Sequence, residues 1–413
     1  MLTGYFLFTM IVPAGSIIAP LGSLGAPSTL VAVFVLVWWM WDLFHRRTPG
    51  QQRVQPVRRA AVVMIVVALI VYRHALLQPL PADELTPSDS SLVRFLALMG
   101  VILVATDGPP HVERWQVLLR RMSQAAAAVS ALALLQFFTR QLWIDMIAIP
   151  GLTPPAAGDL LARSGFSRPS GTSSHPIEFG AVLGMMFPLA INRARIARAD
   201  RKLAWAAVAV MGLAVLVSVS RTALVCAALG TLLLLPTWPR ITRLLGLLAG
   251  FGLTAAAAIA VPGLIGTLRG LFSGVGEDSS VQSRTTGYAY AQEMFGYNPW
   301  LGRGLGTFLP KYYIFDNGYL GLAMEAGVIG VVGFVTLVIT GVIAAACAAR
   351  SFTRFEDRQM AWALFASVVS GAVAMGFFDI FAFPQSAACL ALVVGLSGAA
   401  YRLAREPASD LPK

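Results

Sequence analysis

Long apolar runs, separated by short charged or Pro/Gly-rich segments, dominate this chain. The hydrocarbon core of a bilayer is crossed by a helix of roughly 20 apolar residues. The pattern therefore predicts an all-α polytopic membrane protein with about twelve transmembrane helices and outer-face loops, and residues 1–413 form a single integral membrane domain. The predicted spans are 4–20, 28–44, 60–77, 92–106, 115–138, 176–191, 203–219, 222–236, 241–262, 327–349, 360–381 and 383–401.

Basic residues are concentrated in every second loop. Of the 31 lysines and arginines, 21 lie in the shorter set of loops. Because cytoplasmic loops carry the excess of Lys and Arg, we expect both termini to lie in the cytoplasm. The basic segments are 45–59, 107–121, 192–202, 237–243, 349–358 and 402–413.

Composition agrees with this class and argues against a nucleic-acid partner. The chain is 57% hydrophobic and 12% charged, with a mean hydropathy of +0.72, whereas soluble domains carry about 25% charged residues. The net charge of +11 comes from arginines spread over helix ends, not from one basic face. We therefore expect membrane lipids, and no nucleic acid, as the surroundings of this protein.

Two long segments on the predicted outer side stand out. Segment 139–175 is rich in Gly, Pro and Ser, and segment 263–326 is the longest polar stretch of the chain. The shorter outer segment 73–91 is predicted to be a plain loop. The sequence DNGYLGLAMEAGVIG, over 316–330, is expected to pack over the membrane surface and to enter the next helix obliquely. Because long loops without obvious secondary structure are often functional, we expect 139–175 and 263–326 to form the active site.

Four arginines on the outer side lie in unusual surroundings. Arg221 has apolar residues on both sides, and an arginine at span depth costs about 2.5–3.5 kcal/mol on insertion scales. Arg284 begins an amphipathic stretch, Arg168 lies in FSRPSGTSSHP, and Arg303 lies among glycines that let backbone approach a ligand closely. Clustered guanidinium groups suit a diphosphate, which they bind bidentately without metal. The alternative for each arginine is a surface side chain that reaches lipid headgroups.

Acidic residues supply the candidate base. A carboxylate at the membrane boundary, such as Asp316, can take a proton from a sugar hydroxyl, although Asp316 also suits a helix N-cap. Glu325 and Asp379 lie at the same predicted boundary. His175 is the one histidine of the two long outer segments, and a loop-anchoring hydrogen bond competes with a role as base. No Asp-x-Asp pair is present, so a metal-held nucleotide sugar is not indicated.

Four motifs together resemble a known family. They are RPSGTSSHPIEFGAVL, SVSRTAL, QSRTTGYAYAQEMFGYNPWLGRGLGTF and DNGYLGLAMEAGVIG, in this order over about 168–330. The set is similar to the O-antigen ligase and polymerase superfamily of the Wzy/WaaL type. The resemblance implies a GT-C-like glycosyltransferase of the bacterial cytoplasmic membrane, which moves a glycan from undecaprenyl diphosphate to an acceptor hydroxyl on the outer face. It implies neither metal nor cofactor nor nucleotide sugar.

The resemblance also assigns residue roles. Arg221 and Arg284 occupy the positions of the family arginines expected to hold the diphosphate. With Asp316 they are the candidate catalytic residues. The candidate substrate-binding residues are Arg168, His175, Arg303, Asn317, Tyr319, Glu325 and Asp379.

One departure from the family pattern bears on the choice of function. Many members carry a His before the Asn that precedes the Tyr-Leu pair, and here Asp316 occupies that position. This favours a polymerase of O-antigen or exopolysaccharide repeats over a ligase that moves glycan to lipid A core or protein. A lipid-linked oligosaccharide flippase would need charged residues in the middle of several spans, and the predicted spans hold few. Chain-length regulator and flippase proteins are suggested as partners.

Overall fold

The computed structural model describes residues 1–45, 55–146, 149–154, 161–163, 165–273 and 279–406, without the side chains of 145–146, 162–163 and 279–285. Its described part is almost entirely helical, with one two-residue hairpin, so the predicted all-α polytopic membrane protein is confirmed. The elements in chain order are α1 (Leu2–Ile11), η1 (Ala19–Leu24), α2 (Pro27–His45), α3 (Pro56–Leu76), α4 (Ala82–Asp107), α5 (Val112–Thr139), η2 (Trp143–Met146), β1 (Ala162–Arg163), β2 (Phe166–Ser167), α6 (Pro176–Ile196), α7 (Arg201–Val217), α8 (Arg221–Leu234), η3 (Leu235–Thr237), α9 (Arg240–Ala260), α10 (Leu264–Ser273), α11 (Ser279–Phe295), α12 (Gly318–Ser351), α13 (Phe355–Met375), η4 (Ile380–Ala382) and α14 (Pro384–Leu403).

Each of the twelve predicted spans falls on one helix, but eight helices of the described chain are long and apolar enough to cross a membrane. The total of twelve therefore stays a prediction. The eight helices are α2, α3, α4, α5, α6, α9, α12 and α14.

Several sequence-based boundaries differ from the helix ends, and two of them change the picture. The predicted span 4–20 is helical to Ile11, because the chain that follows turns through Pro13 and the 3₁₀ segment η1. The predicted loop 73–91 is helical from Ala82, so α4 projects about ten residues beyond the predicted span. Pro87 lies inside that extension, in the second turn of α4, where it has no N–H to donate to the carbonyl of Asp83.

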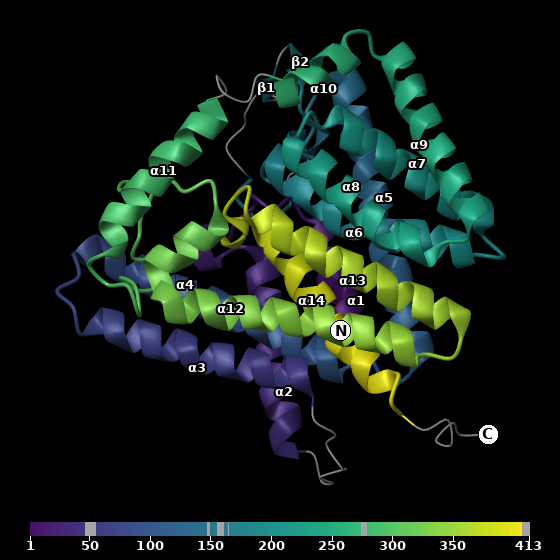
Figure 1. Cartoon of the computed structure of the whole chain (residues 1–413). Coiled ribbons are helices and arrows are strands. Elements are labelled where there is room, and N and C mark those ends of the chain that lie inside the picture. The colour runs from purple at the N-terminus through teal and green to yellow at the C-terminus, as the bar shows by residue number, and fades with distance from the viewer. Residues whose placement is uncertain (46–54, 147–148, 155–160, 164, 274–278, 407–413) are drawn as a thin grey trace.

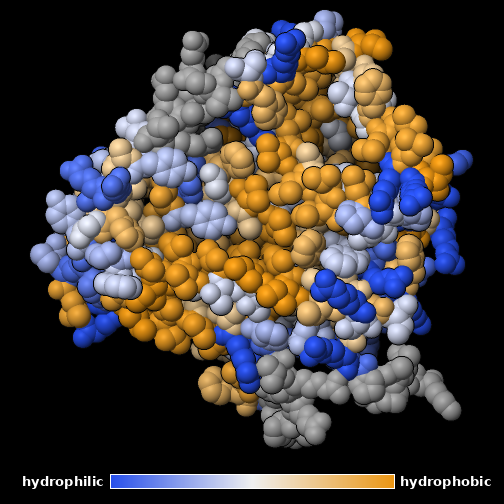
Figure 2. Space-filling view, viewed as in Figure 1, coloured by the Kyte–Doolittle hydropathy of each residue, from blue (hydrophilic) through white to orange (hydrophobic). Residues whose placement is uncertain are grey.

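The buried centre of the bundle contains α6 and α14, and the periphery contains α2 and α9. For their most apolar windows, 89% of α14 and 83% of α6 are buried, against 17% of α2 and 6% of α9. Figure 1 shows α3 and α12 side by side along one edge of the molecule, whereas α9 lies at its opposite margin. Figure 2 shows a broad apolar surface across the middle of this face, with hydrophilic residues toward its two sides. An apolar perimeter around a packed core is what lipid surroundings require.

The basic loops meet at one end of the bundle. Arg120 of α5 pairs with Asp200 at 3.0 Å, Arg354 pairs with Glu113 at 3.7 Å, and Arg402 donates to the carbonyl of Pro109. Segments 107–121, 192–202 and 349–358 therefore share one end, as the positive-inside pattern requires. Parts of two other basic segments, 46–54 and 407–413, lie outside the described residues. Which side of the membrane this end faces stays a prediction.

The opposite end carries the described parts of 139–175 and 263–326, and we call it the loop face. Phe166 of β2 stacks on Phe137 at the end of α5, with ring centroids 6.5 Å apart. Ile17 forms an isolated bridge with Thr153. The two segments predicted to be loops are partly structured, since 263–326 contains α10 and α11.

Two helices that run in the same direction, α6 and α8, begin side by side at the loop face. Gly180 contacts Ala223, Gly184 contacts Cys226 and Pro188 contacts Gly230, so the two helices stay in register along their length. Small residues at these positions let the backbones approach closely. The amino-terminal ends of both helices, with their free N–H groups and positive dipole ends, therefore lie next to each other.

Helix α12 starts at the loop face and is interrupted. Gly327 has φ 63° and ψ −166°, so the first turns, from Gly318, meet the long remainder at an angle. The chain before α12 crosses this break: the N–H of Val328 donates to Pro299 at 2.8 Å, and the N–H of Arg303 donates to Met324 at 2.9 Å. The expectation that 316–330 enters the next helix obliquely agrees with this break.

Candidate functional site

The turn between α7 and α8 positions Arg221. Val219 is fully buried with φ 45°, which is an outlier for a β-branched residue. The turn ends at Ser220, whose hydroxyl caps α8 by accepting the N–H of Ala223 at 3.4 Å. Arg221 follows as the first residue of α8 and is half-buried. Arg221 thus carries its positive charge at a helix N-terminus, where the free backbone N–H groups and the helix dipole already favour a bound anion.

Arg168 lies against the same turn. Its Nε donates to the carbonyl of Ser218 at 3.4 Å, and its side chain is half-buried. The structure therefore brings two of the four predicted arginines, Arg168 and Arg221, to the ends of α6 and α8. With two helix N-termini, they form a cationic region on the loop face.

A buried polar network fixes the segment that precedes α6. The side chain of Gln136 exchanges two hydrogen bonds with the backbone of Gly171, at 2.9 and 2.8 Å. The carboxylate of Glu178 accepts the N–H of Ser174 at 2.9 Å and the N–H of Gln385 at 2.7 Å. Because buried polar groups are costly unless paired, this network holds 171–175 in one conformation. It therefore fixes the position of His175.

His175 is the N-cap of α6. Its Nδ1 accepts the backbone N–H of Ile177 at 3.1 Å, so the predicted loop-anchoring bond is present. Since a backbone N–H can only donate, the neutral ring carries its proton on Nε2. Burial, and next the nearby positive charge of Arg168, lower the pKa of His175, while Asp316 acts in the opposite direction. A neutral ring with a free Nε2–H donor therefore lies within electrostatic reach of both residues.

Asn317, and not Asp316, caps α12. The Oδ1 of Asn317 accepts the N–H of Tyr319 at 3.0 Å, and its Nδ2 donates to the hydroxyl of Tyr288 at 3.3 Å. The hydroxyl of Tyr319 donates to the carbonyl of Ala372 at 2.8 Å and so ties α12 to α13. The alternative of Asp316 as the cap is therefore wrong. Asp316 is half-buried and directly precedes the capping residue.

Tyr288 contacts the candidate site through Asn317. Arg284 lies four residues earlier on the same helix, α11, and its side chain is outside the described residues. This side-chain hydrogen bond connects α11 to the start of α12. The proposed role of Arg284 stays a prediction.

Arg303 is placed away from the other arginines. Its Nε and Nη2 donate to the carboxylate of Glu84 at 3.2, 2.9 and 3.0 Å, and Nη2 also donates to the hydroxyl of Tyr312 at 3.2 Å. Glu84 is fully buried, in the part of α4 that was predicted to be loop. The sequence predicted only a plain loop over 73–91 and so gave no sign of this ion pair. This ion pair fastens the chain before α12 to α4.

The glycines around Arg303 approach protein, not a ligand, which corrects the sequence interpretation. A Cβ on Gly302 would lie 2.5 Å from the backbone of Glu325, and one on Gly306 would lie 2.3 Å from Ser91. Both glycines have positive φ, at 66° and 70°. The glycines beside Arg303 thus let the backbone of residues 302–306 lie directly on the break of α12 and on α4.

Glu325 and Asp379 gather around a residue that sequence reasoning missed, Arg94. Both carboxylates act electrostatically on its guanidinium group. Asp379 caps η4 by accepting the N–H of Phe381 at 3.0 Å. Arg94 lies within predicted span 92–106, and its signal was the same as that of Arg221: a single arginine in an apolar run.

The candidate residues whose side chains are described therefore divide into four groups at the loop face. Arg168, Arg221, His175 and Asp316 lie around the starts of α6, α8 and α12. Asn317 and Tyr319 hold α12, and Glu325 and Asp379 accompany Arg94. Arg303 belongs to a separate ion pair with Glu84. In the part of the chain that the structure describes, no group of three or more His, Cys, Asp or Glu side chains could hold a metal ion.

Comparison with known proteins adds one assignment. The profile of the Wzy_C family, described as O-antigen ligase, matches residues 206–335. The matched region begins in α7, contains Arg221, Arg284 and Asp316, and ends in α12. A comparison with curated proteins gives no match. The family corresponds to an O-antigen ligase or polymerase type of function, carried out by a glycosyltransferase-type membrane enzyme. The match over residues 206–335 supports the O-antigen ligase and polymerase superfamily that the motifs resemble.

Proposed function

We propose that this protein is a polymerase of lipid-linked polysaccharide repeats at the outer face of the bacterial cytoplasmic membrane. The donor is a glycan on undecaprenyl diphosphate, and the acceptor is a sugar hydroxyl of a second lipid-linked repeat. The observation that carries the proposal is the cationic region formed by Arg168, Arg221 and the adjacent starts of α6 and α8. Such a region suits a diphosphate without metal.

In the proposed step, the bond between the anomeric carbon of the donor and the diphosphate oxygen breaks. The electron pair stays on that oxygen, and the charge that develops on the leaving diphosphate is stabilised by Arg168, Arg221 and the helix N-termini. Arg284, from the same family motif set, contributes to the same charge. The acceptor oxygen forms the new bond to the anomeric carbon and loses its proton.

Asp316 is the proposed base for that proton. A cap on α12 does not need its carboxylate, because Asn317 provides it. His175 fits the role of base less well, since its Nδ1 is engaged by Ile177 and its Nε2 carries a proton in the neutral ring. That Nε2–H can instead donate to Asp316 or to the acceptor, and so orient the proton transfer.

Deleting the gene and sizing the cell's glycans tests the function. A polymerase predicts single repeats and no long chains. Full-length glycan stranded on the polyprenyl carrier would instead indicate a ligase, which the name of the matched family also describes. Accumulation of lipid-linked repeats on the cytoplasmic side would indicate a flippase and contradict both enzyme functions.

Purified protein gives the second test. Lipid-linked single repeats, supplied alone in liposomes, should be converted into longer lipid-linked chains with release of undecaprenyl diphosphate. Addition of EDTA should leave the rate unchanged if the arginines alone neutralise the diphosphate. Transfer that requires an added lipid A core acceptor would contradict the polymerase.

A further inference from the structure

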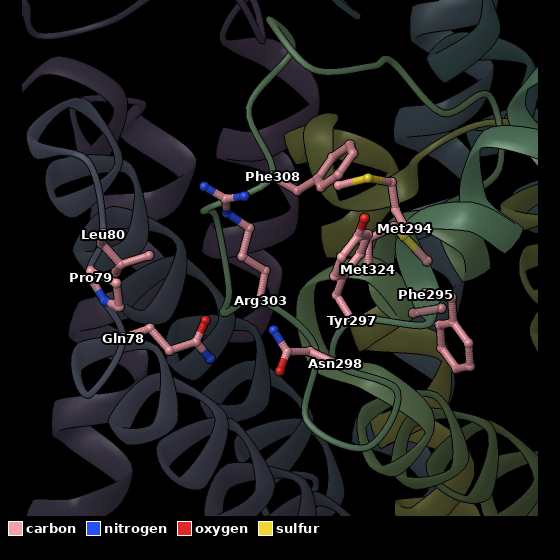
Figure 3. A pocket seen from close by; sticks show the side chains of 11 residues that line it. Gln78, Pro79, Leu80, Met294, Phe295, Tyr297, Asn298, Arg303, Phe308 and Met324 are labelled. Atoms are coloured by element: carbon pink, nitrogen blue, oxygen red, sulfur yellow. The ribbon is translucent and has the colours of Figure 1, made fainter.

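A pocket of about 410 Å³ opens on the loop face between the α3–α4 connection and the chain before α12. Figure 3 shows the amides of Gln78 and Asn298 on facing walls, directed into the space between them, with the side chain of Arg303 above. Tyr297, Phe308 and Met324 complete the wall from α12 and the residues before it. This volume falls within the roughly 300–1,000 Å³ that small-molecule sites occupy.

The pocket has no excess of positive charge, although an arginine lines it. The guanidinium group of Arg303 is paired with the buried carboxylate of Glu84 at 2.9 Å. Lys311 lies three residues after Phe308, which lines the pocket. Its ammonium group is likewise paired, with the carboxylate of Asp83 at 2.5 Å. A neutral ion pair offers hydrogen-bond donors and acceptors without attracting an anion. This separates the pocket from the cationic region around Arg221.

Several polar groups of the pocket have capacity left for a ligand. Within the described residues, the side-chain amide of Asn298 and the Nη1 of Arg303 have no hydrogen-bond partner. Gln78 uses its Nε2 toward His74 at 2.7 Å, which leaves its Oε1 to accept. Half-buried amides of this kind can exchange bound water for the hydroxyl groups of a ligand. Planar polar groups on facing walls of a pocket suit the vicinal hydroxyls of a sugar ring.

Aromatic side chains complement these amides. The ring of Tyr297 is 75% exposed, so its face is open to a ligand. Phe308 lines the pocket and contacts Phe315, with ring centroids 5.3 Å apart. Phe315 directly precedes Asp316, so this ring contact links the pocket to the residue next to the proposed base. The combination of aromatic faces and amides with hydrogen-bonding capacity left distinguishes this pocket from an apolar lipid groove.

We propose that this pocket binds neutral sugar units of the glycan, at a subsite beside the reaction centre. The proposal rests on the proposed function for the identity of the glycan, but the binding itself requires no turnover. Sugar units bound in the pocket would belong to the glycan chain whose reacting sugar lies near Asp316. Their binding would lengthen the time that a chain stays on the enzyme and so increase the number of repeats added.

Direct binding is the decisive experiment. The protein, in lipid nanodiscs free of sugar-headed detergent, is titrated with neutral oligosaccharides that mild acid releases from the cell's lipid-linked glycan. Binding is followed by saturation-transfer NMR. Asn298→Asp, which keeps the shape of the side chain and removes its NH₂ donors, and Tyr297→Ala should each weaken binding at least tenfold. Gln292→Ala, an exposed amide outside the pocket on α11, is the matched control and should bind as the unaltered protein does.

The outcomes separate this proposal from the proposed function. Equal binding by the control and by both pocket variants, with unchanged thermal unfolding, would overturn the sugar site. Competition by inorganic diphosphate would also overturn it, because it would assign the pocket to an anion. In cells, the pocket variants should shorten the chains while single transfers continue. Loss of oligosaccharide binding together with normal chain length would remove the role in chain extension.

Discussion

The Oδ1 of Asn317 accepts the backbone N–H of Tyr319 at 3.0 Å, and this bond begins α12. The neighbouring Asp316, whose carboxylate could have capped the helix, does not supply this cap. The two adjacent residues thus have separable roles, one structural and one chemical, and mutations can tell them apart.

Asp316→Asn should reduce glycan transfer by roughly 10²–10⁴-fold, the usual contribution of a general base, without changing the unfolding temperature. Asn317→Ala should do the reverse, because loss of an N-cap costs about 1 kcal/mol of stability. Transfer assays and thermal unfolding of both variants decide this. Full activity of Asp316→Asn would remove Asp316 from the reaction.

Arg221→Ala should abolish transfer while expression and insertion remain normal, since the leaving diphosphate loses a cation at a helix N-terminus. Arg221→Lys should recover part of the rate, because an ammonium keeps the charge but not the bidentate geometry. Glycan sizing in cells measures both.

Arg284→Ala should abolish transfer in the same way. Arg269→Ala, an exposed arginine of α10, serves as the control and should leave chain length unchanged. Near-normal chains from Arg284→Ala would confine the diphosphate site to the arginines around α6 and α8.

Arg303→Ala should destabilise the protein by up to about 3–5 kcal/mol, because the buried carboxylate of Glu84 then keeps only the hydroxyl of Tyr312 and the ammonium group of Lys311, 3.9 Å away, as partners. The double variant Glu84→Gln/Arg303→Ala should be more stable than Arg303→Ala alone, since the unpaired charge is gone. Thermal unfolding of the two single variants and the double variant forms the cycle. Additive effects would contradict a coupled pair.

The stability of the loop face should depend on pH through His175. Burial and Arg168 lower its pKa from the ordinary 6.5, so the folded state holds the neutral ring. As the pH falls below that value, the unfolded chain takes up the proton first, and the free energy of unfolding decreases until the folded ring is protonated too. Protonated Nδ1 can no longer accept the N–H of Ile177.

His175→Asn isolates this effect, because Asn is a good N-cap that does not titrate. The variant should keep its stability near pH 7 and lose part of the decrease between pH 6.5 and the lowered pKa of His175. Unfolding temperatures measured across this range provide the comparison. Identical pH profiles would show that His175 titrates with an ordinary pKa.

Candidate chemistry was predictable where a residue type conflicted with its local surroundings. Arg221 in an apolar run has no local explanation, and the structure places it at a helix N-terminus beside Arg168. Arg94 carried the same signal. Glu84 did not, because an acid in a polar segment looks solvated until the fold buries it against Arg303. Its partner lies 219 residues away, and no local pattern encodes that separation.

The sequence alone determined the class of this protein. The bilayer requires about 20 apolar residues for each crossing helix, and the positive-inside rule governs the charges of the loops. The positions of the twelve predicted spans on twelve helices reflect that local requirement. Only the tertiary structure decided which residues meet. It set α6 beside α8 through Gly180 and Ala223, gave the cap of α12 to Asn317, and directed Arg303 to Glu84. Those contacts depend on packing between helices distant in the chain, which hydropathy does not specify.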